Sequence, residues 1–256
     1  MKKRAILLVL LLPLLQATAQ QPDAGQIMAK SRDLSITSSL SANINLSITE
    51  KGGSTRNRTI SMTTKSFSDG LEKRLIRFIE PADVRGTAML VVDNKNTADE
   101  MWIYLPALKK TRRIVTSEKG KSFMSSEFSN ADMTSPTISD FNHKHLEKSG
   151  TNNEWIIEST PIDEDKADEY GYSKKISYVS LDKNQVKRME FYNFDNQLFK
   201  IIEIKSFFPL SEGKYMVKNM VARNLNTNRK SEILFSNINE GVKVEDSYFT
   251  IQNLER

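Results

Sequence analysis

Cysteine is absent from all 256 residues of the sequence. The chain therefore forms no disulfide bonds, has no thiol nucleophile and offers no cysteine for a lipoprotein lipid anchor. In an oxidising compartment, packing alone would have to hold its fold. The lack of cysteine excludes the disulfide-rich and zinc–thiolate classes of protein at the outset.

Histidine is almost as scarce, since only His143 and His145 are present. Their spacing places both imidazoles on one face of a predicted strand, but a metal site needs a third or fourth ligand, and only Asp140 and Glu147 lie nearby. Two exposed histidines on a surface strand are the simpler interpretation. The chain also has no G-x-S-x-G elbow, no P-loop and no G-x-G-x-x-G turn. We therefore predict no enzymatic activity, no metal site and no cofactor.

Long apolar segments are missing after residue 19. The longest aliphatic run there is residues 88–92, whereas a membrane-spanning helix needs about 20 residues. No transmembrane segment is therefore predicted. The densest basic cluster, residues 109–113, is too short to indicate a nucleic-acid partner.

The first 19 residues have the pattern of a cleavable secretory signal peptide. Residues 2–4 are basic, residues 5–15 are apolar, and Ala17 and Ala19 put small side chains at the two positions that signal peptidase reads. Cleavage after Ala19 removes three of the 37 basic residues and none of the 32 acidic ones, so 34 basic residues remain against 32 acidic. We predict export to the periplasm, and we do not interpret the positive charge as a binding signal.

Strand signals dominate the rest of the chain. From Leu40 to Thr49 apolar and polar residues alternate strictly, which predicts a strand with one buried and one wet face. Further strands are predicted at residues 58–67, 71–79, 87–93, 101–105, 112–116, 140–148, 154–160, 174–181, 186–192, 198–207, 215–224, 231–238 and 249–254. Short Gly, Asn and Asp turns favour an antiparallel meander that curls around its own apolar face. Because residues 20–256 contain no low-complexity linker and no repeat, we expect one domain.

Three segments depart from this pattern. Residues 23–32 predict a short helix with Asp23 as its N-cap. Residues 163–170 are polar and fit either a helical turn or a loop. Residues 117–139 are expected to form a long loop with one helical turn near residues 130–133.

A group of motifs lies between residues 74 and 133. In order, they are RFIEPADVRGT at residues 77–87, DEMWIYLPAL at 99–108, RRI at 112–114 and SFM at 122–124. Their order and spacing resemble the outer-membrane lipoprotein-sorting family, the LolA-like periplasmic proteins. The chain departs from that pattern where Ser125 replaces a glycine and where Asn130 and Ala131 replace Tyr-Glu.

The resemblance implies a mainly β fold. In it, a strongly curved antiparallel sheet, an unclosed β-barrel, has a few helices over its concave face. Lipid or acyl chains would lie in the apolar space beneath those helices. Flexible methionine side chains and aromatic rings would suit such a ligand.

The candidate ligand-binding residues are those that the strands and the loop are expected to present to this space. They are Ile44, Leu46, Ile60, Met62, Met89, Met101, Trp102, Tyr104, Arg112, Arg113, Phe123 and Phe128. Because Arg112 and Arg113 are adjacent on a strand, at most one faces the space. That arginine would pair with a lipid head group, or with Glu127 or Asp132. Ordinary core packing for the apolar residues, and solvated cations for the arginines, are the alternatives.

Three functional interpretations follow. The first is a non-enzymatic, monomeric periplasmic carrier that binds lipid or lipoprotein acyl chains and moves them towards the outer membrane. The second is an envelope sensor, or an accessory interaction subunit of an inner-membrane lipid or drug exporter, with that transporter as its partner. The third is a metal-dependent hydrolase built on His143 and His145. The resemblance favours the first.

Signal-peptide cleavage predicts Gln20 as the first residue of the mature protein. Peptide mass spectrometry of protein isolated from the periplasm is expected to give an N-terminal peptide that begins at Gln20. An intact Met1 in that sample would contradict the prediction.

Overall fold

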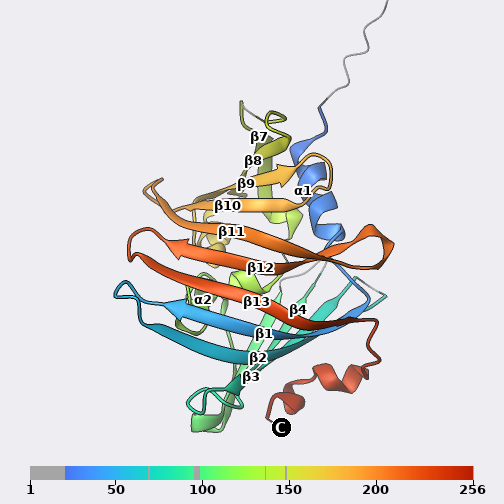
Figure 1. The fold of residues 1–256 in the computed structure, drawn as a ribbon, viewed down its shortest axis with the longest axis vertical. Coiled ribbons are helices and arrows are strands. Elements are labelled where there is room, and N and C mark those ends of the chain that lie inside the picture. The colour runs from blue at the N-terminus through green and yellow to red at the C-terminus, as the bar shows by residue number, and fades with distance from the viewer. Residues whose placement is uncertain (1–20, 69, 95–98, 136, 148, 256) are drawn as a thin grey trace, which may run out of the picture.

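The computed structural model describes residues 21–68, 70–94, 99–135, 137–147 and 149–255 (Figure 1). The predicted signal peptide and its cleavage site lie outside these ranges. Within them, no helix is both long enough and apolar enough to cross a membrane.

The strands of the described residues form one antiparallel sheet. Its order is β6-β5-β4-β3-β2-β1-β13-β12-β11-β10-β9-β8-β7, so β1 and β13 pair in its middle while β6 and β7 are its edges. The strands are β1 (Ser39–Thr49), β2 (Thr55–Ser66), β3 (Glu72–Glu80), β4 (Ala88–Asp93), β5 (Glu100–Leu105), β6 (Lys110–Arg113), β7 (Phe141–His145), β8 (Glu154–Pro161), β9 (Lys174–Ser180), β10 (Val186–Tyr192), β11 (Leu198–Pro209), β12 (Tyr215–Asn224) and β13 (Arg229–Glu240). Figure 1 shows the sheet curving strongly, with β3 and β4 receding behind β1 and β13. The predicted mainly β, unclosed antiparallel fold is confirmed.

The helical elements of the described residues are short. They are α1 (Ala24–Asp33), α2 (Thr116–Lys119), α3 (Glu164–Tyr170), and the 3-10 turns η1 (Pro106–Leu108), η2 (Phe123–Ser125), η3 (Ala131–Met133), η4 (Ile138–Asp140), η5 (Ser211–Gly213), η6 (Asp246–Phe249) and η7 (Ile251–Glu255). The turn expected near residues 130–133 is thus confirmed as η3, and the polar stretch at 163–170 is helix α3.

The alternation in β1 sets the inner face of the sheet. Leu46 and Ile48 are fully buried, whereas the Ser47 hydroxyl faces the other side and donates to Asn57 Oδ1 at 2.7 Å. Inward residues of β1 join one apolar cluster with residues from strands on both sides, from Met101 of β5 to Ile202 of β11. We call this the concave face.

Helices α1 and α3 cover the β7–β9 end of the concave face. Asp23 caps α1 by accepting from Gln26 N, as predicted, and Ile27 packs with Ile157 of β8 and Val179 of β9. At α3, the Tyr170 ring lies 4.7 Å from that of Phe141 on β7, centroid to centroid.

Helix α2 docks tightly on the end of α3. A Cβ added at Gly120 would lie 2.8 Å from the Cα of Gly171, so neither position has room for a larger residue. Gly171 also has φ +77°, a left-handed conformation that favours glycine at a helix end. Beside this contact the buried Lys119 and Glu169 form an ion pair.

The C-terminal segment differs from the prediction. Residues 249–254 were expected to form a strand, but they lie in η6 and η7 against the convex face of β3–β5. Phe249 and Leu254 are both buried there with Leu75 and Leu90. Since two residues five apart point to opposite faces of a strand, only turns bring both onto one apolar surface.

Candidate functional site

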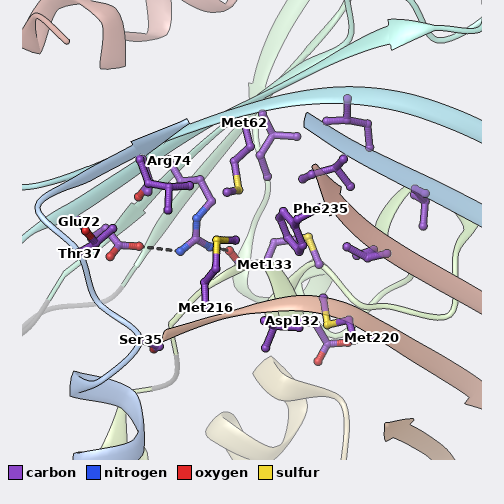
Figure 2. Close-up of a pocket in the computed structure, with 18 of the residues that line it drawn as sticks. Ser35, Thr37, Met62, Glu72, Arg74, Asp132, Met133, Met216, Met220 and Phe235 are labelled. Atoms are coloured by element: carbon purple, nitrogen blue, oxygen red, sulfur yellow. Dashed lines mark hydrogen bonds and ion pairs between the residues drawn. The ribbon is translucent and has the colours of Figure 1, made fainter. Parts of the chain in front are cut away.

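A cavity of about 270 Å³ lies between the concave face and residues 116–135, which we call the covering segment (Figure 2). It is lined by Ser35, Thr37, Leu40, Ile44, Leu46, Ile60, Met62, Thr64, Glu72, Arg74, Ile76, Phe123, Asp132, Met133, Leu210, Met216, Val217, Met220, Ile233 and Phe235. Most of these side chains are apolar and come from β1, β2, β3, β12 and β13. The polar ones gather mainly at one end, where Figure 2 shows Arg74, Glu72, Thr37 and Ser35.

Methionine is prominent in this wall. Met62, Met133, Met216 and Met220 all line the cavity. An unbranched thioether side chain adapts to irregular partners, so this wall suits a flexible apolar ligand. Sequence reasoning identified Met62 but did not assign Met216 or Met220. Their spacing of four places them on one face of a regular strand, a signal that was available.

Five of the twelve predicted site residues line the cavity: Ile44, Leu46, Ile60, Met62 and Phe123. Met89, Met101 and Phe128 are almost completely buried in the same apolar cluster but do not form the cavity wall. Phe128 is linked to the cavity residue Phe123 through the backbone, since Phe123 N donates to Phe128 O at 2.7 Å.

The structure does not bring Trp102 and Tyr104 to the cavity. Residues of β5 alternate between faces, so Met101 and Ile103 point to the concave side and leave Trp102 and Tyr104 on the convex side. There they pack near Phe249 of the C-terminal turns. Both faces of β5 are apolar because a different layer of the protein covers each of them, and not because both contact one ligand space.

Arg112 and Arg113 also lie away from the cavity. Their side chains are 44% and 49% exposed, and they pair with Glu118 at 2.6 Å and Glu100 at 3.8 Å. The expected pairing with Glu127 or Asp132 is not formed. Those two carboxylates instead pair with Arg229 and Lys200. Because β6 is an edge strand at the rim, both of its arginines reach solvent.

Five polar side chains of the sheet hold the covering segment. The contacts are Arg58 to Met124 O, Arg74 to Met133 O, Lys200 to Asp132, and Arg229 and Ser231 to Glu127. They come from β2, β3, β11 and β13, on both sides of β1. These polar contacts add to the apolar packing of Phe123, Phe128 and Met133, which belong to the core cluster of the concave face.

Arg74 is the cationic group at the polar end of the cavity. Its guanidinium lies 2.6 Å from Glu72 Oε1 and 3.9 Å from Asp93 Oδ2. Burial acts to lower the pKa of Arg74, but the two carboxylates outweigh it and raise the pKa. Arg74 therefore stays charged and fixes both carboxylates beside the cavity.

Asp93 is the perturbed acid of this cluster. Burial is the main cause that raises the pKa of Asp93 to about 7, with added repulsion from Glu72 and Asp99. Arg74 and a hydrogen bond from Ser135 N oppose the shift. A carboxyl group that titrates near neutrality at the edge of a cavity is typical of functional sites.

A second charged group lies at the other end, behind Asp132. Lys200 Nζ is 2.8 Å from Asp132 Oδ2, and the buried Lys175 lies close enough to interact with both. Burial, with repulsion from Lys200, lowers the pKa of Lys175 to about 8. The same ammonium lies 5.4 Å from the centre of the Phe141 ring.

The two histidines are half-buried and bonded within the protein, not exposed as expected. His143 contacts Ser159 Oγ and Ile138 O, and His145 contacts Ser149 Oγ and Pro22 O. Burial is the main cause that lowers the pKa of His143. Among the described residues, no group of three or more His, Asp or Glu side chains is arranged to hold a metal ion.

Asp93 should make stability depend on pH. Its folded pKa, about 7, lies above its ordinary value of 3.8, so stability is expected to fall as pH rises from about 4 to about 7. Asp93→Asn has a neutral side chain at every pH. Its free energy of unfolding relative to that of the wild type should therefore increase by roughly 2–3 kcal/mol from pH 5 to pH 8. Denaturant unfolding at both pH values measures this.

The exposed Asp33→Asn is the matched control and is expected to leave the pH profile unchanged. Parallel profiles for wild type and Asp93→Asn would show that Asp93 ionises normally.

Comparisons with known proteins agree with this architecture. A family model described as that of an uncharacterized protein matches residues 70–256. No curated protein matches the chain. Three solved structures are similar to it over nearly their whole lengths.

A domain described as an outer membrane lipoprotein-sorting protein, from Vibrio parahaemolyticus, has a TM-score of 0.83 at 24% identity, over 91% of this chain and 98% of that one. A DUF1329 family protein from Desulfovibrio piger has a TM-score of 0.81 at 27% identity, over 90% and 97%. A LolA superfamily protein from Nitrosomonas europaea has a TM-score of 0.70 at 18% identity, over 91% and 100%. The chain therefore belongs to the uncharacterized family of that model, and its fold is that of the LolA-like outer-membrane lipoprotein-sorting proteins.

Proposed function

We propose that residues 20–256 act as a single, non-enzymatic periplasmic carrier of lipid or lipoprotein acyl chains, which it moves towards the outer membrane. The observation that carries this proposal is the methionine-rich cavity beneath a covering segment that is held by polar contacts. The lipoprotein-sorting description of the Vibrio parahaemolyticus domain supports the choice of cargo and compartment.

The energetics of an acyl chain fit such a cavity. Transfer of a chain from water to an apolar site gains about 0.8 kcal/mol per methylene, or roughly 12 kcal/mol for a 16-carbon chain. A carrier retains this gain only if its site excludes water. The side chains of Leu46, Ile60 and Phe123, each almost fully buried, provide such a wall.

The size of the cavity implies movement of the covering segment. Its volume of about 270 Å³ is at the small end of ligand pockets, which span about 300–1,000 Å³. A long chain therefore needs more room than the closed form gives. In this proposal the covering segment moves to provide it and exchanges its polar contacts for water.

Blocking the cavity should prevent lipid from co-purifying. Ile233 and Leu234 are neighbours on β13, but Ile233 lines the cavity, whereas Leu234 is 41% exposed on the other face. Ile233→Trp is expected to lower the lipid-to-protein ratio at least about threefold, and Leu234→Trp to leave it unchanged. Mass spectrometry of organic extracts from the purified proteins measures the ratio, and circular dichroism checks the fold.

Two results would contradict the proposal. Absence of acyl lipid in wild-type extracts argues against a carrier. Equal lipid content in both variants would place any bound lipid elsewhere.

The covering segment should be more accessible when the cavity is empty. Trypsin is expected to cut after Lys121 several-fold faster in delipidated protein than in lipid-loaded protein, with cleavage after Lys183, in the exposed turn between β9 and β10, as the internal reference. Phe123→Ser with Phe128→Ser should lower lipid retention while the sheet stays folded. Equal cleavage rates and unchanged retention would leave the segment as plain scaffold.

A further inference from the structure

We propose that the polar end of the cavity binds the primary ammonium head group of an amphiphile whose chain lies among the methionines. This inference rests on the proposed function and names the class of ligand. It is carried by the group of Thr64, Glu72, Arg74 and Asp93, which joins the cavity to a neighbouring pocket.

The location of the group suits a head group. Thr64, Glu72 and Arg74 line the apolar cavity, and Glu72 also lines a second pocket of about 260 Å³ together with Asp93. Ile76 and Met62 follow Arg74 and Thr64 on the same face, towards the apolar part. A chain in the cavity therefore brings its polar end against Glu72 (Figure 2).

Two buried oxygen atoms at this polar end lack a hydrogen-bond donor. Thr64 Oγ1 and Asp93 Oδ1 have no hydrogen-bond partner among the described residues, and both residues are only 6% exposed. Leaving a buried polar atom unpaired costs about 1–3 kcal/mol. The donors of Arg74 that form hydrogen bonds here go to Glu72 and Met133 O, and neither of the two unpaired oxygen atoms receives one.

The charge balance gives the sign of the ligand. Two buried carboxylates, Glu72 and Asp93, face one guanidinium, and Asp99 adds further negative charge. At the rim of the second pocket, Arg32 is neutralised by Asp33 at 2.9 Å. An ammonium group would supply three donors and the missing positive charge, whereas a carboxylate or phosphate would meet repulsion.

The test compares three amphiphiles that share a twelve-carbon chain: dodecylamine, dodecanol and dodecanoate. Calorimetric titration at pH 7.5, below the micellar range, is expected to show the amine at least about tenfold tighter than the alcohol, and the acid weaker than the alcohol. Asp93→Asn should reduce the preference for amine over alcohol towards unity. Asp182→Asn, in an exposed turn outside both pockets, is the matched control and should keep the preference.

Two further measurements guard against a variant that fails to fold. Thr64→Val should lower amine affinity a few-fold more than alcohol affinity. In the wild type, the preference should shrink at pH 5.5, where Asp93 is protonated while Arg74 stays charged. Arg74 and Glu72 of β3, Asp99 before β5 and Ser135 N of the covering segment are the groups that face Asp93.

The outcomes separate the inference from the proposed function. Equal affinities for amine and alcohol, preference for the acid, or an amine preference that survives both Asp93→Asn and Thr64→Val would each overturn the head-group assignment and leave chain binding intact. No binding of any of the three amphiphiles would overturn the carrier proposal itself.

Discussion

The apolar concave face of the open sheet is the constraint on which the rest of the structure depends. A sheet that buries Leu46, Ile48 and Ile60 on one side needs a second layer, and its edge strands β6 and β7 do not meet to close it. Helices α1 and α3 supply that layer over the β7–β9 end. Over the remaining face the covering segment spans the curve without filling it, and the cavity is the unfilled volume.

The sequence patterns predicted the strands and their buried faces better than they predicted the residues that line the cavity. Strict alternation identified β1 and its inner face, because period two leaves only two choices. Both faces of β5 are apolar, so the sequence could not show which of them the concave side uses, and both Met101 and Trp102 became candidates although they lie on opposite faces. Glu72 and Arg74 escaped notice because charged residues on a strand normally indicate solvent. Only the fold shows that they are buried as a pair.

The covering segment is held both by apolar packing and by polar contacts with the sheet. Apolar packing of Phe123 and Phe128 excludes water from the cavity. Polar contacts such as that of Arg58 with Met124 O add to this packing. A hydrogen bond from a charged donor such as Arg58 contributes about 1.5–3 kcal/mol net. Apolar packing and polar contacts together therefore make the covering segment part of the second layer.

The turn η3 contacts a charged group at each end of the cavity. Asp132 pairs with Lys200 at one end, and the next residue, Met133, accepts through its carbonyl from Arg74 at the other. Lys175 and Lys200 leave an excess of positive charge behind Asp132, while Glu72 and Asp93 leave an excess of negative charge around Arg74. Because Asp132 and Met133 are consecutive, both charged groups hold the covering segment at the same turn.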